Sequence, residues 1–126
     1  MTILILFLIG RFLFSMIFIF TGITQLLKFN ETVKYMSSLK VPFPTLSTLG
    51  SSIMALAGGG GIIYHSYCLY GAIAIILFLV PSTYFGHKFW SAPNKKEKNN
   101  QMQHFMKNIA LTGGAIIIAV ASLYIK

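Results

Sequence analysis

Four long apolar runs, separated by short stretches that hold most of the charge, constrain this chain more than any other feature. The runs cover residues 3–27, 45–64, 69–89 and 105–124. Each is long enough for a helix that crosses a hydrocarbon core of about 30 Å. A lipid-exposed segment must satisfy its own backbone hydrogen bonds, and the alternation typical of a β-barrel is not visible. The runs therefore predict four transmembrane helices.

The length and composition leave room for little else. Of the 126 residues, 56% are hydrophobic, and four such helices use roughly 80 residues. We therefore expect an all-α membrane protein with one domain over residues 1–126. The net charge of +8 does not indicate nucleic acid as a partner, because the lysines flank apolar runs. Lysines at such places set topology or meet anionic lipid headgroups.

The connections between the runs predict an up-down-up-down bundle, because short connections join antiparallel neighbours. Loop one (residues 28–44) and loop three (residues 91–103) then share one side of the membrane. Loop two (residues 65–68) and both termini share the other. The positive-inside rule places the lysine-rich side in the cytoplasm. That side holds eight lysines, namely Lys28, Lys34, Lys40, Lys88, Lys95, Lys96, Lys98 and Lys107, whereas the other side has Lys126.

The second run is rich in small residues and is the least lipid-like. Four consecutive glycines, Gly58, Gly59, Gly60 and Gly61, follow a stretch of serines and threonines. Small residues let helix backbones approach closely. We expect this run to pack against several neighbours, with Gly113 and Gly114 of the fourth run facing it. The glycines serve packing on the simplest interpretation, and a binding or hinge role is the alternative.

Arg11 is the residue whose insertion into a membrane costs the most free energy, because it lies well inside the first apolar run. It follows Ile3 by roughly 12 Å of helix, which predicts a place near the middle of the bilayer. A charge there costs about 2.5–3.5 kcal/mol. Both acids, Glu31 and Glu97, lie in loops. We expect Arg11 to use backbone carbonyls, hydroxyls such as Ser15, water or a bound anion, or else to extend toward the nearer surface.

A second group of polar side chains comes together at the lysine-rich side. The bundle brings Gln25, His87, Lys107 and Asn108 to this side, with Trp90 in an aromatic wall beside them. An imidazole exchanges protons near neutral pH, and a lysine with an amide can hold an oxygen-rich ligand. These residues predict a site for a quinone head or a lipid phosphate. The alternative is that they anchor helix ends at the interface, where His, Trp and Lys are common.

Catalytic and metal chemistry find little support in the sequence. His65 and Cys68 of loop two provide two potential ligands, and a zinc site needs three or four. A Ser-His-acid set lacks its acid. We therefore expect no metal and lean against an enzyme.

Several of these pieces occur in an order that resembles the DoxX family of small four-helix bacterial membrane proteins. The first run carries Arg11-Phe12-Leu13 and later Thr21-Gly22, and loop one contains Val41-Pro42. The glycine cluster follows in the second run, and His87 precedes aromatic residues at the end of the third. The most specific piece is Lys107-Asn108-Ile109 followed by Gly113-Gly114.

The resemblance also exposes two departures. DoxX proteins usually carry a glutamate just before the second-run glycines, where this chain has Leu56. Many carry a lysine shortly after the first-run glycine, where this chain has Gln25. The resemblance implies that the missing glutamate would be the natural partner of Arg11.

The resemblance implies a multi-pass protein of the bacterial inner membrane, linked to quinone-coupled oxidation or to oxidative-stress assemblies. The leading hypothesis is an accessory subunit that binds a quinone or lipid and partners a redox or stress-response enzyme. A second hypothesis is an assembly chaperone or scaffold that acts through the glycines, and a homo-oligomer is compatible with either. A small proton-coupled exporter ranks last, because such exporters need an intramembrane carboxylate.

Overall fold

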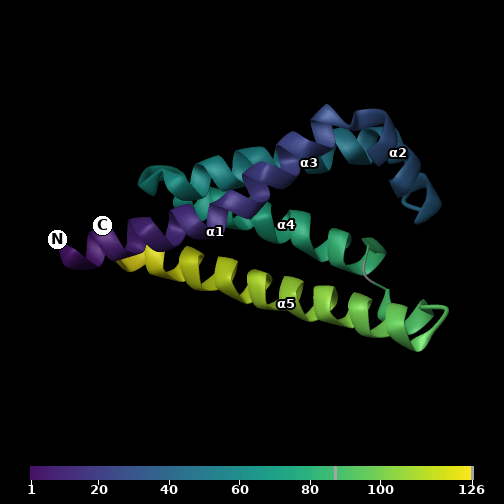
Figure 1. Cartoon of the computed structure of the whole chain (residues 1–126). Helices are drawn as coiled ribbons and strands as arrows, with labels where there is room; N and C mark the ends of the chain where they lie inside the picture. Colours follow the sequence, from purple (N-terminus) through teal and green to yellow (C-terminus); the bar gives the residue numbers. More distant parts are fainter. Residues whose placement is uncertain (87, 126) are drawn as a thin grey trace.

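The computed structural model describes residues 1–86 and 88–125, and these form a helical bundle without strands (Figure 1). Four of the described helices are long and apolar enough to cross a membrane. The fifth, α2, is short. The elements are α1 (Thr2–Leu27), α2 (Phe29–Ser38), α3 (Pro44–Ile63), η1 (His65–Tyr67), α4 (Cys68–Gly86), η2 (Phe89–Ser91) and α5 (Lys95–Tyr124).

The long helices run up and down in sequence order, which confirms the predicted all-α membrane fold. Both ends of the described chain lie beside the α3–α4 connection, while α2 and the start of α5 lie at the opposite end (Figure 1). In chain order, α1 packs on α3, α3 on α4 and α4 on α5, whereas α1 and α5 make few contacts. The large apolar side chains on the outside, such as Phe20, Ile53 and Ile117, are exposed, as expected for surfaces that face lipid.

The structure corrects the expectation for loop one, which contains the helix α2. Phe29, Val33 and Met36 recur at helical spacing, so this short helix has one apolar face. That face meets the start of α3, where the Thr48 hydroxyl donates to the Met36 sulfur at 3.2 Å. Loop one therefore contains a helix that packs on the start of α3 at this end of the bundle.

The fourth helix also begins earlier than the apolar run suggests. α5 starts at Lys95, within the stretch expected to be a loop. Asn94 caps the helix, because its side chain accepts a hydrogen bond from the Glu97 backbone N–H at 2.8 Å. Glu97 also places negative charge in the first turn, where the helix dipole favours it. The charged residues of loop three are therefore the first turns of a long helix.

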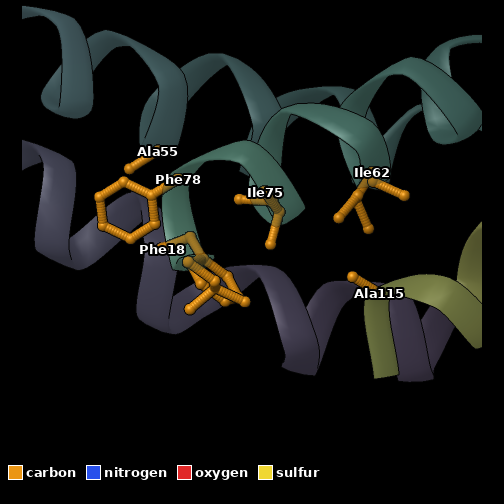
Figure 2. Packing of buried hydrophobic residues seen from close by; sticks show 8 residues of the cluster. Phe18, Ala55, Ile62, Ile75, Phe78 and Ala115 are labelled. Carbon is orange, nitrogen blue, oxygen red and sulfur yellow. The ribbon is translucent and has the colours of Figure 1, made fainter. Parts of the chain in front are cut away.

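The buried core lies where the long helices meet (Figure 2). Phe18 of α1 and Phe78 of α4 pack edge to face, with ring centroids 6.2 Å apart. Ala55 and Ile62 of α3 and Ala115 of α5 close the core and are buried. The core thus ties all four long helices together.

The glycines of α3 bring it close to both of its neighbours. A Cβ at Gly58 would lie 2.9 Å from Ile75, and one at Gly59 would lie 2.8 Å from Ile19 of α1. A Cβ at Gly61 would lie 3.2 Å from the Gly71 Cα of α4. Gly60, by contrast, has no atom within 4 Å of such a position. Most of this glycine face is therefore filled by the protein's own helices.

The glycines of α5 differ from the expectation that they face α3. A Cβ at Gly114 would lie 3.1 Å from Phe14 of α1, and Gly113 has no atom within 4 Å of its position. α5 packs on α4 instead, and the Phe14 ring of α1 lies beside Gly114.

Candidate functional site

A partly open cavity of about 620 Å³ lies at the lysine-rich end of the bundle. We call it the wedge cavity, because the pair α1–α3 and the pair α4–α5 diverge around it (Figure 1). Its volume falls within the range of ligand pockets, roughly 300–1,000 Å³. All five α-helices contribute to its lining, including Gln25, Tyr35, Ser51, Phe78, Lys107 and Asn108.

Three of the residues predicted from sequence meet in this cavity. Gln25 reaches it from α1, and Lys107 and Asn108 reach it from α5. Gln25 is more than eighty positions from Lys107 and Asn108 in the chain, and the antiparallel topology brings α1 and α5 together here. Lys107 is exposed, whereas Gln25 and Asn108 are half-buried. The polar part of the cavity therefore lies near its opening.

The Gln25 amide is fixed against α3 by two serine hydroxyls. Ser52 Oγ donates to Gln25 Oε1 at 2.8 Å and Ser51 Oγ donates to it at 3.2 Å. Both hydroxyls also lie within hydrogen-bonding distance of the Thr48 carbonyl. Each hydroxyl has a single proton, so it alternates between these acceptors. The network holds one polar wall of the cavity in place.

The apolar interior of the cavity was not anticipated from the sequence. Phe18 and Phe78, both core residues, line it, together with Met54 and Leu111. Tyr35 and Met36 of α2 also line it, and the amphipathic spacing of α2 is the signal that would have revealed this wall. The cavity is thus apolar inside and polar at its opening, the arrangement that suits an amphipathic ligand.

The remaining candidates of the lysine-rich end stand apart from the described lining. Trp90 packs in an aromatic cluster with Tyr84, Phe89 and Phe105, at centroid distances between 5.3 and 6.0 Å. This cluster joins η2 to α4 and α5, and its position suits an interface anchor. His87 lies outside the described residues.

Arg11 lies at the opposite end of the bundle from the wedge cavity. Its Nη1 donates to the carbonyls of Ile62 at 3.2 Å and Ile63 at 3.0 Å. These two carbonyls belong to the last turn of α3, where a helix leaves carbonyls without intrahelical partners and bears the negative end of its dipole. Arg11 therefore uses backbone carbonyls, one of the alternatives that the sequence left open, and the end of a helix takes the place of a carboxylate.

The structure places Arg11 level with the loop-two end of α3, and its depth near mid-bilayer stays a prediction. α3 has 20 residues, and a helix of this length is about 30 Å long, close to the thickness of a hydrocarbon core. Arg11 is level with the last turn of α3 and with Cys68, the first residue of α4. α1 begins at Thr2, so it extends about two turns beyond the end of α3.

The surroundings of Arg11 are tightly packed. The side chain is 5% exposed, and its Cζ lies 4.7 Å from the centroid of the Phe7 ring. The Cys68 thiol lies beside the guanidinium and near Ser122 of α5. Arg11 Nε and Ser15 Oγ are buried without a hydrogen-bond partner among the described residues. Arg11 thus joins α1 to the end of α3 and to the start of α4.

Leu56 lies too far from Arg11 for a glutamate at this position to be its neighbour. A Cβ on Gly22 of α1 would lie 2.6 Å from Leu56 Cγ, so these two residues are neighbours. Gly22 lies eleven residues beyond Arg11, roughly 16 Å along the helix. The missing carboxylate is therefore not the missing partner of this arginine.

Comparison with known proteins identifies the family to which this fold belongs. The DoxX family profile matches residues 6–88. The chain belongs to the DoxX family. It is also 28% identical over 116 residues to the inner membrane protein YphA of Escherichia coli strain K12, covering 92% of this chain and 82% of that protein. No solved structure matches the chain significantly.

The family match and the four apolar helices make this DoxX protein a multi-pass protein of the inner membrane, in contact with the bilayer. The profile ends at residue 88, so it covers Arg11, Gln25 and the glycines of α3. The α5 motif that begins at Lys107 lies outside the profile match, although it was the most specific piece of the sequence resemblance.

Proposed function

We propose that this DoxX protein is an accessory subunit of the inner membrane that holds a quinone or lipid in the wedge cavity. The observation that supports this function is the cavity itself, with its apolar interior and the polar groups of Gln25, Lys107 and Asn108 near its opening. An amphipathic molecule would place its chain against Phe18 and Phe78 and its head near Lys107.

We also propose that the protein presents this ligand to a redox or stress-response enzyme. Support comes from the DoxX resemblance. A stand-alone catalytic role has less support, because the polar groups near the opening include no described carboxylate. Affinity purification from gently cross-linked membranes tests this proposal, and an oxidoreductase should be enriched. Finding none, with unchanged membrane redox activity in a deletion strain, contradicts the partnership.

Filling the cavity from its wall tests ligand binding. Gly50 lines the cavity, and a Cβ there would have no atom within 4 Å. Gly50→Leu should therefore occupy the ligand space without displacing the backbone. We expect it to lower the amount of quinone or lipid retained through purification by about ten-fold, as native mass spectrometry measures it.

Gly60→Leu is the matched control, because Gly60 lies on the same helix, is equally open and does not line the cavity. Both variants should keep the wild-type circular dichroism spectrum. Equal retention by both variants and the wild type would show that the wedge cavity does not hold the ligand.

A further inference from the structure

We propose that the wedge cavity binds an anionic membrane phospholipid, whose phosphate is held by Lys107 and Asn108 and whose chain enters between α1 and α5. This inference rests on the proposed function, because it names the class of the amphipathic ligand. It distinguishes a charged phospholipid from a neutral quinone.

The charge of the lining favours an anionic head. Lys107 is the one charged side chain among the described residues that line the cavity. The end of the bundle around it carries seven more lysines, and the chain has only two acids, Glu31 and Glu97. Each lysine near a membrane surface attracts anionic lipid by about 1 kcal/mol. A neutral head gains nothing from this field.

Three hydroxyls of the lining are bonded to backbone carbonyls, whereas Lys107 and Asn108 lie near the opening. Ser47 Oγ donates to the Pro42 carbonyl at 2.7 Å, and Ser82 Oγ donates to the Phe78 carbonyl at 2.7 Å. Thr32 is also bonded to its own helix, through the Lys28 carbonyl. Each hydroxyl has one proton to give, so these groups are already used. The Lys107 ammonium keeps three donors at the opening.

The helix packing gives the chain of a lipid a path from the bilayer. α1 and α5 make few contacts, and Phe14 and Gly114 meet where the seam between them closes. Toward the lysine-rich end the two helices diverge (Figure 1). Thr21 of α1 and Leu111 of α5 line the cavity on either side of this seam. A lipid can therefore enter sideways and keep its head at the level of the lysines.

A binding titration of the full-length protein in detergent tests the proposal. Dioctanoyl phosphatidylglycerol, dioctanoyl phosphatidylethanolamine and decylubiquinone are added separately, and native mass spectrometry reports each affinity. We expect phosphatidylglycerol to bind roughly five-fold more tightly than phosphatidylethanolamine, and Lys107→Gln to remove this difference. Lys95→Gln is the matched control, because it removes the same charge from the same helix outside the lining, and it should keep most of the difference.

Three results would overturn the proposal. The first is equal affinity for the two phospholipids, and the second is an equal effect of the two lysine variants. The third is displacement of phosphatidylglycerol by millimolar inorganic phosphate, which would identify a soluble anion as the ligand. Binding of decylubiquinone alone, lost in Gly50→Leu, would leave the proposed function standing and the phospholipid excluded. Binding of none of the three would contradict both.

Discussion

Arg11 shows how one residue can be charged, buried and stable without a carboxylate. Its two hydrogen bonds go to carbonyls that the end of α3 leaves without partners. The guanidinium therefore satisfies two acceptors while the helix dipole supplies a partial negative charge. A hydrogen bond that involves a charged group contributes about 1.5–3 kcal/mol. Arg11 therefore connects α1 to the loop-two end of the bundle by hydrogen bonds.

Replacing Arg11 should lower the stability of the fold, because these hydrogen bonds are lost. Arg11→Ala leaves two carbonyls without their donor and empties a packed space, so we expect the free energy of unfolding to fall by about 2–4 kcal/mol. Unfolding by added denaturing detergent, followed by circular dichroism, measures this change. Lys28→Ala at the exposed end of α1 should change stability by less than about 0.5 kcal/mol. An Arg11→Ala protein as stable as the wild type would show that the carbonyl bonds contribute nothing net.

At the scale of the elements, the contact between α3 and α4 depends on glycine. A Cβ at Gly71 would lie 2.6 Å from the Ile62 nitrogen and 2.7 Å from the Gly58 oxygen. Both atoms belong to the backbone of α3, so neither can turn aside as a side chain can. The two helices touch along their main chains, as small residues allow in membranes.

Gly71→Ala should therefore separate α3 from α4. We expect a loss of about 1–3 kcal/mol in stability, because the inserted methyl group forces a backbone shift. The matched substitution Gly60→Ala meets no atom within 4 Å and should be neutral or stabilising by up to about 1 kcal/mol, since alanine is the better helix former. Thermal unfolding in detergent compares the two. Equal melting temperatures for Gly71→Ala and Gly60→Ala would mean that α3 and α4 are not in main-chain contact.

For the whole molecule, the lysine-rich end holds α2, the wedge cavity and the start of α5, and the opposite end holds loop two. The positive-inside rule predicts that the lysine-rich end lies in the cytoplasm. The wedge cavity would then open toward the cytoplasmic leaflet, which carries the anionic surface potential that the lysines favour.

Cysteine labelling tests this orientation. Cys68 is buried and can be replaced by alanine before single cysteines are added at exposed positions. Ser66→Cys in η1 should react with a membrane-impermeant maleimide in intact spheroplasts, whereas Lys40→Cys should react only after the membrane is opened. The reverse pattern would place the lysine-rich end outside.

The apolar runs were sufficient to predict the four spans and their alternation, because bilayer thickness fixes helix length. The meeting of Gln25, Lys107 and Asn108 also followed from topology. The contact of Arg11 with the end of α3 did not, because the register of α1 against α3 is set by which glycine meets which side chain. The wall that α2 adds to the cavity was not predicted. α2 is short and packs against Thr48, and it contains no long apolar run.

The bond between Arg11 and the end of α3 bears on how the protein is made. The carbonyl of Ile62 lies 51 residues after Arg11 in the chain. When α1 leaves the ribosome, the partner of its arginine has not been synthesised. Until α3 is present, the Arg11 guanidinium therefore lacks the two carbonyl acceptors that it has in the folded bundle. The hydrogen bonds of Arg11 thus depend on both of the first two spanning helices, α1 and α3, being in place.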